Sequence, residues 1–319
     1  MTGVSRQERR ARALGAYLGF AVGDALGATV EFLSAQEIAE RYGTHRRMIG
    51  GGWLGLKPGQ ITDDTEMCLA LGRAILRCEG FALPAMAEEL VRWYRSRPVD
   101  IGATCLRGIR RYLSCGSLAA ERSRWDGGNG ACLRNLPVVL ATLGDEESFR
   151  RWTVDQCHFT HNHPFSDAGT VTLGEMVRSL LAGGGISEAR AAAGRLIALH
   201  PVFAFDPYPV SASGYVVDTL QTVFFTFFGT DSFSSCLIAT VNRGGDADST
   251  GALAGMLAGA HYAIEGIPKG WLRKLNPKVA AEIESQVDGL LTLADSRMGR
   301  GATGGGRAGV GEKGLPTVD

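Results

Sequence analysis

The sequence predicts an all-α protein built as one domain, and three observations support this prediction. Apolar residues recur at helical spacing through most of the chain, whereas alternating or β-branched runs long enough for a sheet are missing. Glycine supplies 44 of the 319 residues, about twice its usual share, which favours helices packed backbone to backbone. No composition shift before about residue 296 and no internal repeat indicates a second unit. We expect one domain over residues 1–298 and, because apolar side chains become too few for a core, a flexible Gly-rich tail over residues 299–319.

The candidate helices follow one another between glycine- and proline-rich breakers. In the first, Leu14, Leu18 and Val22 recur every fourth position and would form one apolar face. Residues 50–52 and 205–209 are examples of the breakers. The same periodicity predicts, in order, helices at 9–28, 65–78, 83–94, 103–113, 131–143, 147–157, 166–181, 187–199, 214–228, 232–241, 250–264 and 277–293.

Charge and cysteine content exclude several classes of protein. Thirty-three basic and 33 acidic residues give a net charge of zero, so no overall field attracts nucleic acid or an anionic membrane. Seven scattered cysteines without a C-x-x-C pair indicate reduced thiols in a cytoplasmic protein. No uncharged stretch reaches the roughly 18 apolar residues of a membrane span. The arginines before residue 13 imitate a signal peptide, but the stretch that follows keeps helical spacing and is interpreted as a helix.

The most informative segment is 242–251, which leads into a helix of small residues. Its Asp246 and Asp248 stand two positions apart, and hydroxyls follow at Ser249 and Thr250. Oxygen ligands of this kind suit Mg²⁺, Mn²⁺ or Ca²⁺ better than zinc. Helix capping is the structural alternative, although a cap needs only one such residue. A calcium EF-hand is excluded, because Leu257 stands where that loop needs a bidentate Glu.

A second acidic turn lies at residues 60–66, again immediately before an apolar helix. Adjacent Asp63 and Asp64 repel each other unless a cation or hydrogen-bond donors lie between them. A charged first helical turn would explain the segment by itself. Two helix N-termini that both carry paired carboxylates and a hydroxyl are, however, what a centre with two metal ions needs. Glu31 is a third acid, flanked by apolar residues, and buried acids are rare without a partner.

Three motifs in this order resemble the ADP-ribosylglycohydrolase family. They are G-D-A-L-G-x-x-x-E at residues 23–31, T-D-D-T at residues 62–65 and G-G-D-A-D-S-T-G-A-L-A-G at residues 244–255. The resemblance implies an all-α orthogonal bundle with a central site for two Mg²⁺ or Mn²⁺ ions. Its implied metal ligands are Thr62, Asp63, Asp64, Asp246, Asp248 and Ser249, the last being Thr in many members.

The resemblance also implies roles for residues outside the metal ligands. Glu31 and Asp100 match acids with catalytic roles, although Asp100 could simply begin the next helix. Residues 126–131 could cradle a diphosphate on backbone N–H groups, or form a plain turn. Substrate contacts are implied for Asn129, Gly130, Arg134, His161, Tyr215, Arg243, Gly244 and Gly245. For Tyr215, packing in the core is an equal alternative, and a zinc site in residues 158–163 lacks companion ligands.

The function implied by the resemblance is metal-dependent removal of ADP-ribose from an arginine side chain. The similarity points to members that act on the nitrogenase iron protein and so restore nitrogenase activity. It also implies control by a PII-type signalling protein and, through that partner, recruitment to the inner membrane. Two alternatives stay open: hydrolysis of another conjugate, such as ADP-ribosylserine or O-acetyl-ADP-ribose, and regulatory binding of ADP-ribose without turnover.

Overall fold

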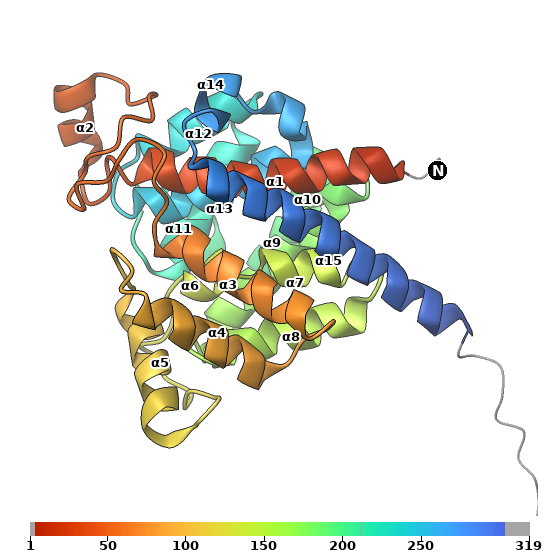
Figure 1. Ribbon diagram of the computed structural model, residues 1–319. Helices are drawn as coiled ribbons and strands as arrows, with labels where there is room; N and C mark the ends of the chain where they lie inside the picture. Colours follow the sequence, from red (N-terminus) through yellow and green to blue (C-terminus); the bar gives the residue numbers. More distant parts are fainter. Residues whose placement is uncertain (1–3, 211, 304–319) are drawn as a thin grey trace, which may run out of the picture.

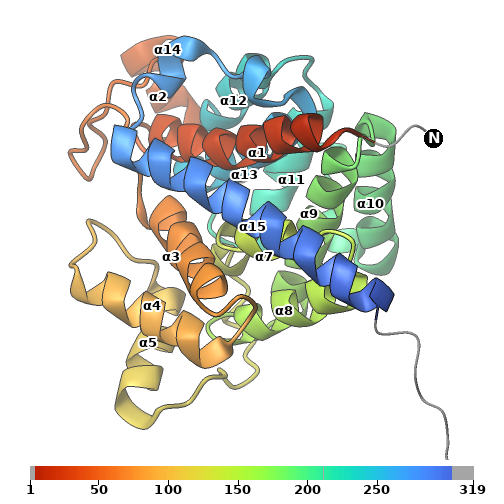
Figure 2. The same ribbon diagram turned by 45° about the vertical axis from the view of Figure 1, so that its right-hand side comes forward.

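The computed structural model describes residues 4–210 and 212–303, which fold into a bundle of helices. These described residues contain three isolated β-bridges and no β-strand, so the all-α prediction is confirmed. Figure 1 shows α1 crossing the upper part of the molecule and α15 sloping from beside α1 down to the level of α8. In Figure 2, α9 and α10 stand across the direction of α1 at one side of the bundle.

The helices follow the predicted order. They are α1 (Arg6–Gly27), α2 (Ala35–Tyr42), α3 (Asp63–Arg77), α4 (Leu83–Arg95), α5 (Ala103–Cys115), α6 (Gly130–Leu133), α7 (Leu136–Ala141), α8 (Glu146–His158), α9 (Pro164–Leu181), α10 (Ile186–Leu199), α11 (Val216–Phe228), α12 (Phe233–Val241), α13 (Ala247–Tyr262), α14 (Lys269–Leu272) and α15 (Pro277–Thr303). Short 3₁₀ turns occur at η1 (Pro201–Phe203) and η2 (Ile264–Gly266). Within the described part of the chain, no helix combines the length and apolarity needed to cross a membrane.

Besides the short α14, which was not predicted, the structure differs from the predicted elements at three places. The helix expected over 131–143 is divided into α6 and α7, because Pro137 lies in the first turn of α7 and lacks the N–H that a continuous helix would use. The unpredicted α2 is fixed by a capping box between Ser34 and Glu37, whose carboxylate accepts from the Ser34 N–H at 2.8 Å. At the C-terminal end, α15 includes the first residues of the expected tail, and residues 304–319 lie outside the described residues.

A glycine seam joins α1 and α13, which run antiparallel to each other, since Gly15 faces Gly259 and Gly23 faces Gly251. A Cβ on Gly23 would lie only 2.0 Å from the carbonyl oxygen of Gly251, and one on Gly259 would lie 1.9 Å from that of Gly15. Larger residues would therefore push the two backbones apart. The expectation of helices packed backbone to backbone is confirmed. Because the seam is antiparallel, it brings the C-terminal end of α1 beside the N-terminal end of α13.

Candidate metal centre

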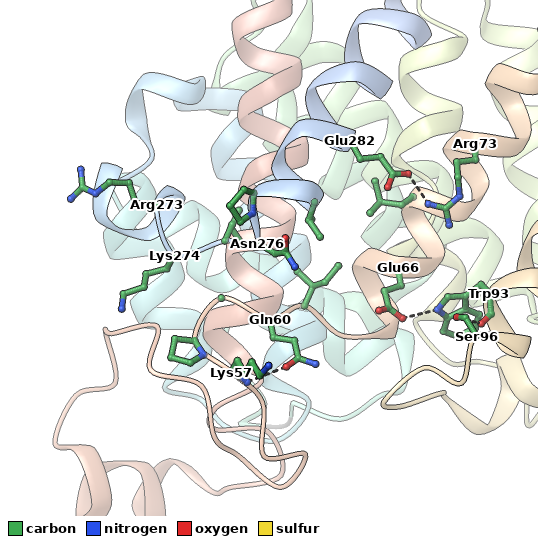
Figure 3. A pocket seen from close by; sticks show the side chains of 17 residues that line it. Lys57, Gln60, Glu66, Arg73, Trp93, Ser96, Arg273, Lys274, Asn276 and Glu282 are labelled. Carbon is green, nitrogen blue, oxygen red and sulfur yellow. Dashed lines mark hydrogen bonds and ion pairs between the residues drawn. The ribbon is translucent and has the colours of Figure 1, made fainter.

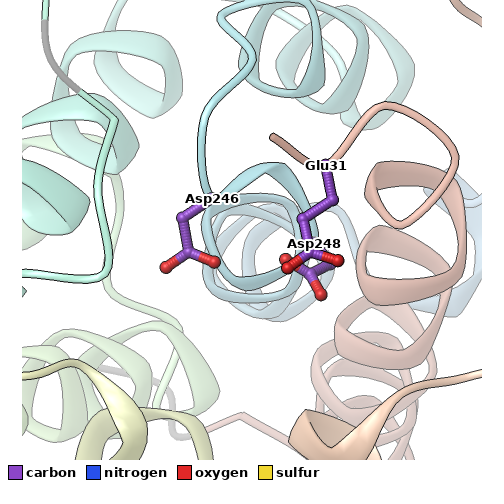
Figure 4. A group of neighbouring side chains, drawn as sticks. All are labelled: Glu31, Asp246 and Asp248. Carbon is purple, nitrogen blue, oxygen red and sulfur yellow. The ribbon is translucent and has the colours of Figure 1, made fainter. Parts of the chain in front are cut away.

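Six buried or partly buried carboxylates gather where α1, α3 and α13 meet. We call them the acidic centre: Asp24, Glu31, Asp63, Asp64, Asp246 and Asp248. Figure 4 shows the carboxylates of Glu31, Asp246 and Asp248 turned toward one another, and one oxygen of each lies within 4.8 Å of the others. The Ser249 hydroxyl of α13 donates to Asp64 of α3 at 2.8 Å. The two acidic turns, far apart in the sequence, therefore form one site.

Asp24 fixes the beginning of α3. It projects from the last turns of α1, is fully buried and accepts hydrogen bonds from the backbone N–H of Thr62 at 3.1 Å and of Thr65 at 3.3 Å. The Thr65 hydroxyl donates to the same carboxylate. Burial raises the pKa of Asp24 to about 6. Asp24 lies within the first motif, but no role was predicted for it. Its position inside an apolar, glycine-rich helix could have indicated a buried acid at the site.

The turn before α13 is shaped by two glycines with left-handed backbones. Gly244 and Gly245 have φ of 73° and 64°, and a Cβ on Gly245 would lie 1.9 Å from the Ala212 carbonyl oxygen. This conformation lets the turn pair with the segment after α1, since the Phe32 N–H donates to the Gly245 carbonyl at 2.7 Å. Asp246 accepts from the Asn129 side-chain amide at 2.6 Å. Of the predicted residues, Asn129 thus contacts the acidic centre directly, and Gly244 and Gly245 shape the turn that carries Asp246.

Glu31 is held by a residue that sequence reasoning missed. The Trp53 indole N–H donates to a Glu31 carboxylate oxygen at 2.6 Å, from a glycine-rich turn between α2 and α3. Burial first, and then repulsion by neighbours that include Asp246 and Asp100, raise the pKa of Glu31 to about 8. Nothing in the local sequence signals this contact, because it depends on how the turn folds back over α1.

The electrostatics of the acidic centre favour a bound cation. Among the described residues, none of its six carboxylates forms an ion pair with an arginine or lysine. Burial, followed by repulsion from Asp100, raises the pKa of Asp63 to about 7. Burial and repulsion by neighbouring carboxylates also raise the pKa values of Asp64 and Asp248 well above the usual range. Buried carboxylates and hydroxyls without a protein counter-charge are the donor set that hard divalent cations use.

Asp100 lies beside the acidic centre and is more exposed than most of its members. Its repulsion contributes to the raised pKa values of Glu31, Asp63 and Asp246, in each case after burial. The N–H of Gly102, two residues after Asp100, donates to Asp63 at 3.1 Å. The acid matched by resemblance therefore stands next to the predicted metal ligands, on a turn that contacts one of them.

Arg134 and His161 lie beneath the turn that carries Asn129. The guanidinium of Arg134 is fully buried and donates to the Gln156 carbonyl at 2.8 Å and to the Thr160 hydroxyl at 2.7 Å. The His161 ring contacts the same hydroxyl at 2.6 Å and lies 3.0 Å from where a Cβ on Gly130 would be. The Arg134 guanidinium and Nδ1 of the His161 ring are thus occupied by protein partners, and the His161 ring packs against the turn at Gly130.

Tyr215 and Arg243 occupy the side of the site near α11. Tyr215 packs its ring against Gly127, where an added Cβ would lie 2.9 Å away, and is 38 % exposed. The Arg243 guanidinium lies over the rings of Tyr208 and Phe225, at 4.8 and 5.0 Å from their centroids. The three histidines considered for zinc have separate hydrogen-bond partners: His158 contacts Asp167, His161 contacts Thr160 and His163 accepts from Phe165.

A cavity of about 810 Å³ lies elsewhere, between the segment before α3, the end of α4 and the beginning of α15 (Figure 3). Its walls include the Glu66–Trp93 hydrogen bond at 2.7 Å and the Arg73–Glu282 ion pair at 2.6 Å. None of the acidic-centre residues lines it. Its walls therefore lack the carboxylate cluster that a divalent cation needs.

The comparisons with known proteins agree with the arrangement of the acids. The family model for ADP-ribosylglycohydrolase matches residues 5–300. The chain is 57 % identical to ADP-ribosyl-[dinitrogen reductase] glycohydrolase of Rhodospirillum rubrum, over 92 % of this chain and 99 % of the relative. It is 33 % identical to ADP-ribosylarginine hydrolase Tri1 of Serratia proteamaculans (strain 568), over 85 % and 77 %.

A solved structure, described as an ADP-ribosylglycohydrolase-related protein complex, has a TM-score of 0.80 to this fold. The two are 32 % identical, and the match covers 90 % of this chain and 99 % of the other. The similarity therefore includes the backbone fold as well as the sequence. With a matching family model over nearly its whole length, relatives of high identity and the acidic centre built from the three motifs, the chain belongs to the ADP-ribosylglycohydrolase family.

Proposed function

We propose that this protein hydrolyses the bond between ADP-ribose and an arginine side chain of a target protein, and that the target is dinitrogen reductase, the nitrogenase iron protein. The observation that carries the proposal is the acidic centre, in which acids at α1, α3 and α13 gather and none forms an ion pair with a described arginine or lysine. The names of the Rhodospirillum and Serratia relatives support the linkage and the target.

The proposed cofactors are two divalent cations, Mn²⁺ or Mg²⁺. Thr62, Asp63 and Asp64 would hold them from α3, and Asp246, Asp248 and Ser249 from α13. The contact between Ser249 and Asp64 at 2.8 Å supports a shared ligand set. When bound, such ions polarise sugar oxygens and lower the pKa of bound water.

In the overall reaction, water adds its oxygen to the anomeric carbon, the carbon–nitrogen bond breaks, and a proton passes to the departing guanidine nitrogen. Asp100 and Glu31 are proposed to manage that proton and the positive charge on the anomeric carbon. The turn containing Asn129 and Gly130 would cradle the diphosphate, and Tyr215 would line the adenosine side. Five further residues would shape the diphosphate and adenosine surfaces by packing against the turns that form them: Arg134, His161, Arg243, Gly244 and Gly245.

The direct test compares release of ADP-ribose from three substrates in the presence of Mn²⁺: arginine-modified dinitrogen reductase, a serine-modified protein and O-acetyl-ADP-ribose. We expect the first to be cleaved fastest, and Asp63→Ala or Asp246→Ala to abolish cleavage while the helical content is retained. Preferential cleavage of either other substrate would assign the site to another conjugate. Tight ADP-ribose binding without product from any substrate would make the protein a regulatory binder.

Several wider expectations stay predictions. The domain over residues 1–298 and the cytoplasmic location come from composition and cysteine content, whereas control by a PII-type signalling protein and recruitment through it to the inner membrane come from the resemblance. A pull-down with a PII-type protein, followed by an activity assay of the complex, tests the regulatory part.

A further inference from the structure

Three exposed apolar side chains stand directly beside the two proposed catalytic acids. Phe32 follows Glu31, Trp53 is hydrogen-bonded to Glu31, and Val99 precedes Asp100. Their exposed fractions are 64 %, 54 % and 48 %. The rings of Phe32 and Trp53 contact each other, with centroids 5.4 Å apart. We call these three residues the rim.

The backbone of Phe32 gives a second indication that this exposure serves binding. Phe32 has φ of 63°, in the left-handed region that residues other than glycine, asparagine and aspartate rarely adopt. Such a conformation costs on the order of 1–2 kcal/mol. Burial of the side chain offsets little of that cost, because the residue is 64 % exposed; the Phe32 N–H bond to the Gly245 carbonyl holds the conformation. An apolar ring held exposed beside a reactive site is available for contact with a ligand.

The chemistry of the proposed substrate indicates which part of it would contact the rim. Glu31 and Asp100 act at the bond between the sugar and the guanidinium, so the arginine must lie next to them. The arginine is attached to its polypeptide through a short aliphatic stem. The polypeptide therefore passes the residues that flank these two acids, and those residues are apolar and exposed. In the proposed function, the ribose lies at the acidic centre and the negatively charged diphosphate at the turn that carries Asn129.

From this arrangement we propose that the rim is a docking surface for the polypeptide around the modified arginine, so that protein substrates are preferred over free ADP-ribosylarginine. This inference rests on the proposed function. Aromatic side chains such as Phe32 and Trp53 supply much of the affinity at protein interfaces, because they offer large rigid surfaces. The contact is made with equal strength before and during the reaction, so it should lower KM for protein substrates more than it raises kcat.

The experiment measures kcat and KM with Mn²⁺ on two substrates, arginine-ADP-ribosylated dinitrogen reductase and free ADP-ribosylarginine. For Phe32→Ala, the expected loss in kcat/KM on the protein is about tenfold, mainly through KM, with little change on the small substrate. Phe32→Asn is a second variant, because asparagine tolerates the left-handed backbone and removes only the ring. Val99→Ala should show the same selectivity with a smaller loss.

Two controls separate the rim from other effects. Trp53→Phe keeps an exposed ring but removes the donor to Glu31, so it should impair both substrates equally. Leu199→Ala removes an exposed apolar side chain, 76 % accessible, from the end of α10, which lies across the molecule from α2 in Figure 2. It should leave both substrates unaffected.

The outcomes distinguish this inference from the function on which it rests. Equal losses on both substrates in Phe32→Ala and Phe32→Asn would show that the ring contacts ADP-ribose itself, and would overturn the docking surface. Unchanged kinetics on the protein would overturn it as well. If the wild-type protein releases ADP-ribose from neither substrate, the proposed function fails first and the docking surface falls with it.

Discussion

The acidic centre and a second buried acid, Glu89, show two ways in which this fold treats negative charge in its interior. Glu89 on α4 is only 3 % exposed, and three arginines surround it: Arg73 and Arg77 from α3 and Arg92 from its own helix. The acidic centre holds six carboxylates, none with such a partner among the described residues. Both groups use α3, so the difference is set by local residues and not by depth in the bundle.

The contrast teaches what each arrangement is for. A buried acid that only supports the fold is accompanied by cations from the chain, because an uncompensated buried charge costs several kcal/mol. Where compensation is missing, the counter-charge must come from outside as protons or metal ions. The glycine seam makes this possible, because backbone contact between α1 and α13 holds the opposing carboxylates together despite their repulsion.

The largest expected effect comes from neutralising one acid of the centre. Asp64→Asn keeps the shape of the side chain and can still accept from Ser249, but removes one negative charge. Activity should fall by about a thousandfold or more, since the cation would lose a charged ligand. The metal-free variant should nevertheless melt at a higher temperature than the metal-free wild type, because repulsion from the neighbouring carboxylates is relieved. Steady-state kinetics and thermal melts in a chelator measure the two effects.

Metal addition is the control for this prediction. Mn²⁺ should raise the melting temperature of the wild type strongly, by mass action on the folded state, and that of Asp64→Asn only weakly. If neither Mn²⁺, Mg²⁺ nor chelator changes the stability of the wild type, the inference that bound metal ions balance the charge of the acidic centre is wrong.

The features that could be predicted from the sequence differ between the acidic centre and the surroundings of Glu89. The two acidic turns were predictable, because paired aspartates and hydroxyls at the beginnings of two helices are a local pattern. The division at Pro137 and the capping box at Ser34 were also present in the local sequence, though periodicity alone passed over them. The contact of Trp53 with Glu31 and the contacts of Arg73 and Arg77 with Glu89 were not predictable, because they join segments whose proximity only the folded chain creates.

Neutralising Glu89 should have a smaller effect than neutralising Asp64, and it should lower the stability of the metal-free protein instead of raising it. Glu89→Gln removes the charge that the three arginines share, and so leaves them repelling one another. Since these arginines are 40 %, 41 % and 66 % exposed, solvent screening limits the loss to about 1–3 kcal/mol in the free energy of unfolding. The specific activity of the folded enzyme should be unchanged, because Glu89 does not contact the acidic centre.

Urea unfolding of Glu89→Gln and Asp64→Asn, both in chelator, forms the matched comparison, since each replaces a carboxylate by an amide. Destabilisation of both variants to the same extent would show that the fold makes no distinction between the two groups of acids.

The smallest effect on stability concerns an ion pair whose positive charge, on a histidine, is lost when the pH rises. His158 at the end of α8 contacts Asp167 of α9 at 2.9 Å, and this hydrogen bond raises the pKa of His158 above its usual value. The stabilisation is therefore complete below the pKa of the unfolded state, near 6.5, and is lost as the pH rises through the higher folded-state pKa. Because both side chains are partly exposed, the expected loss is less than about 1 kcal/mol.

Titration of the acidic centre would obscure so small a change, so the measurement must be a difference. The free energy of unfolding of the wild type minus that of Asp167→Asn, both loaded with Mn²⁺, should decrease between about pH 5 and about pH 9. The contribution of the centre cancels, because both proteins contain it unchanged. A difference that is constant over this range would mean that Asp167 stabilises the α8–α9 contact by packing alone, and compensation by charge would then be restricted to the arginine cluster at Glu89.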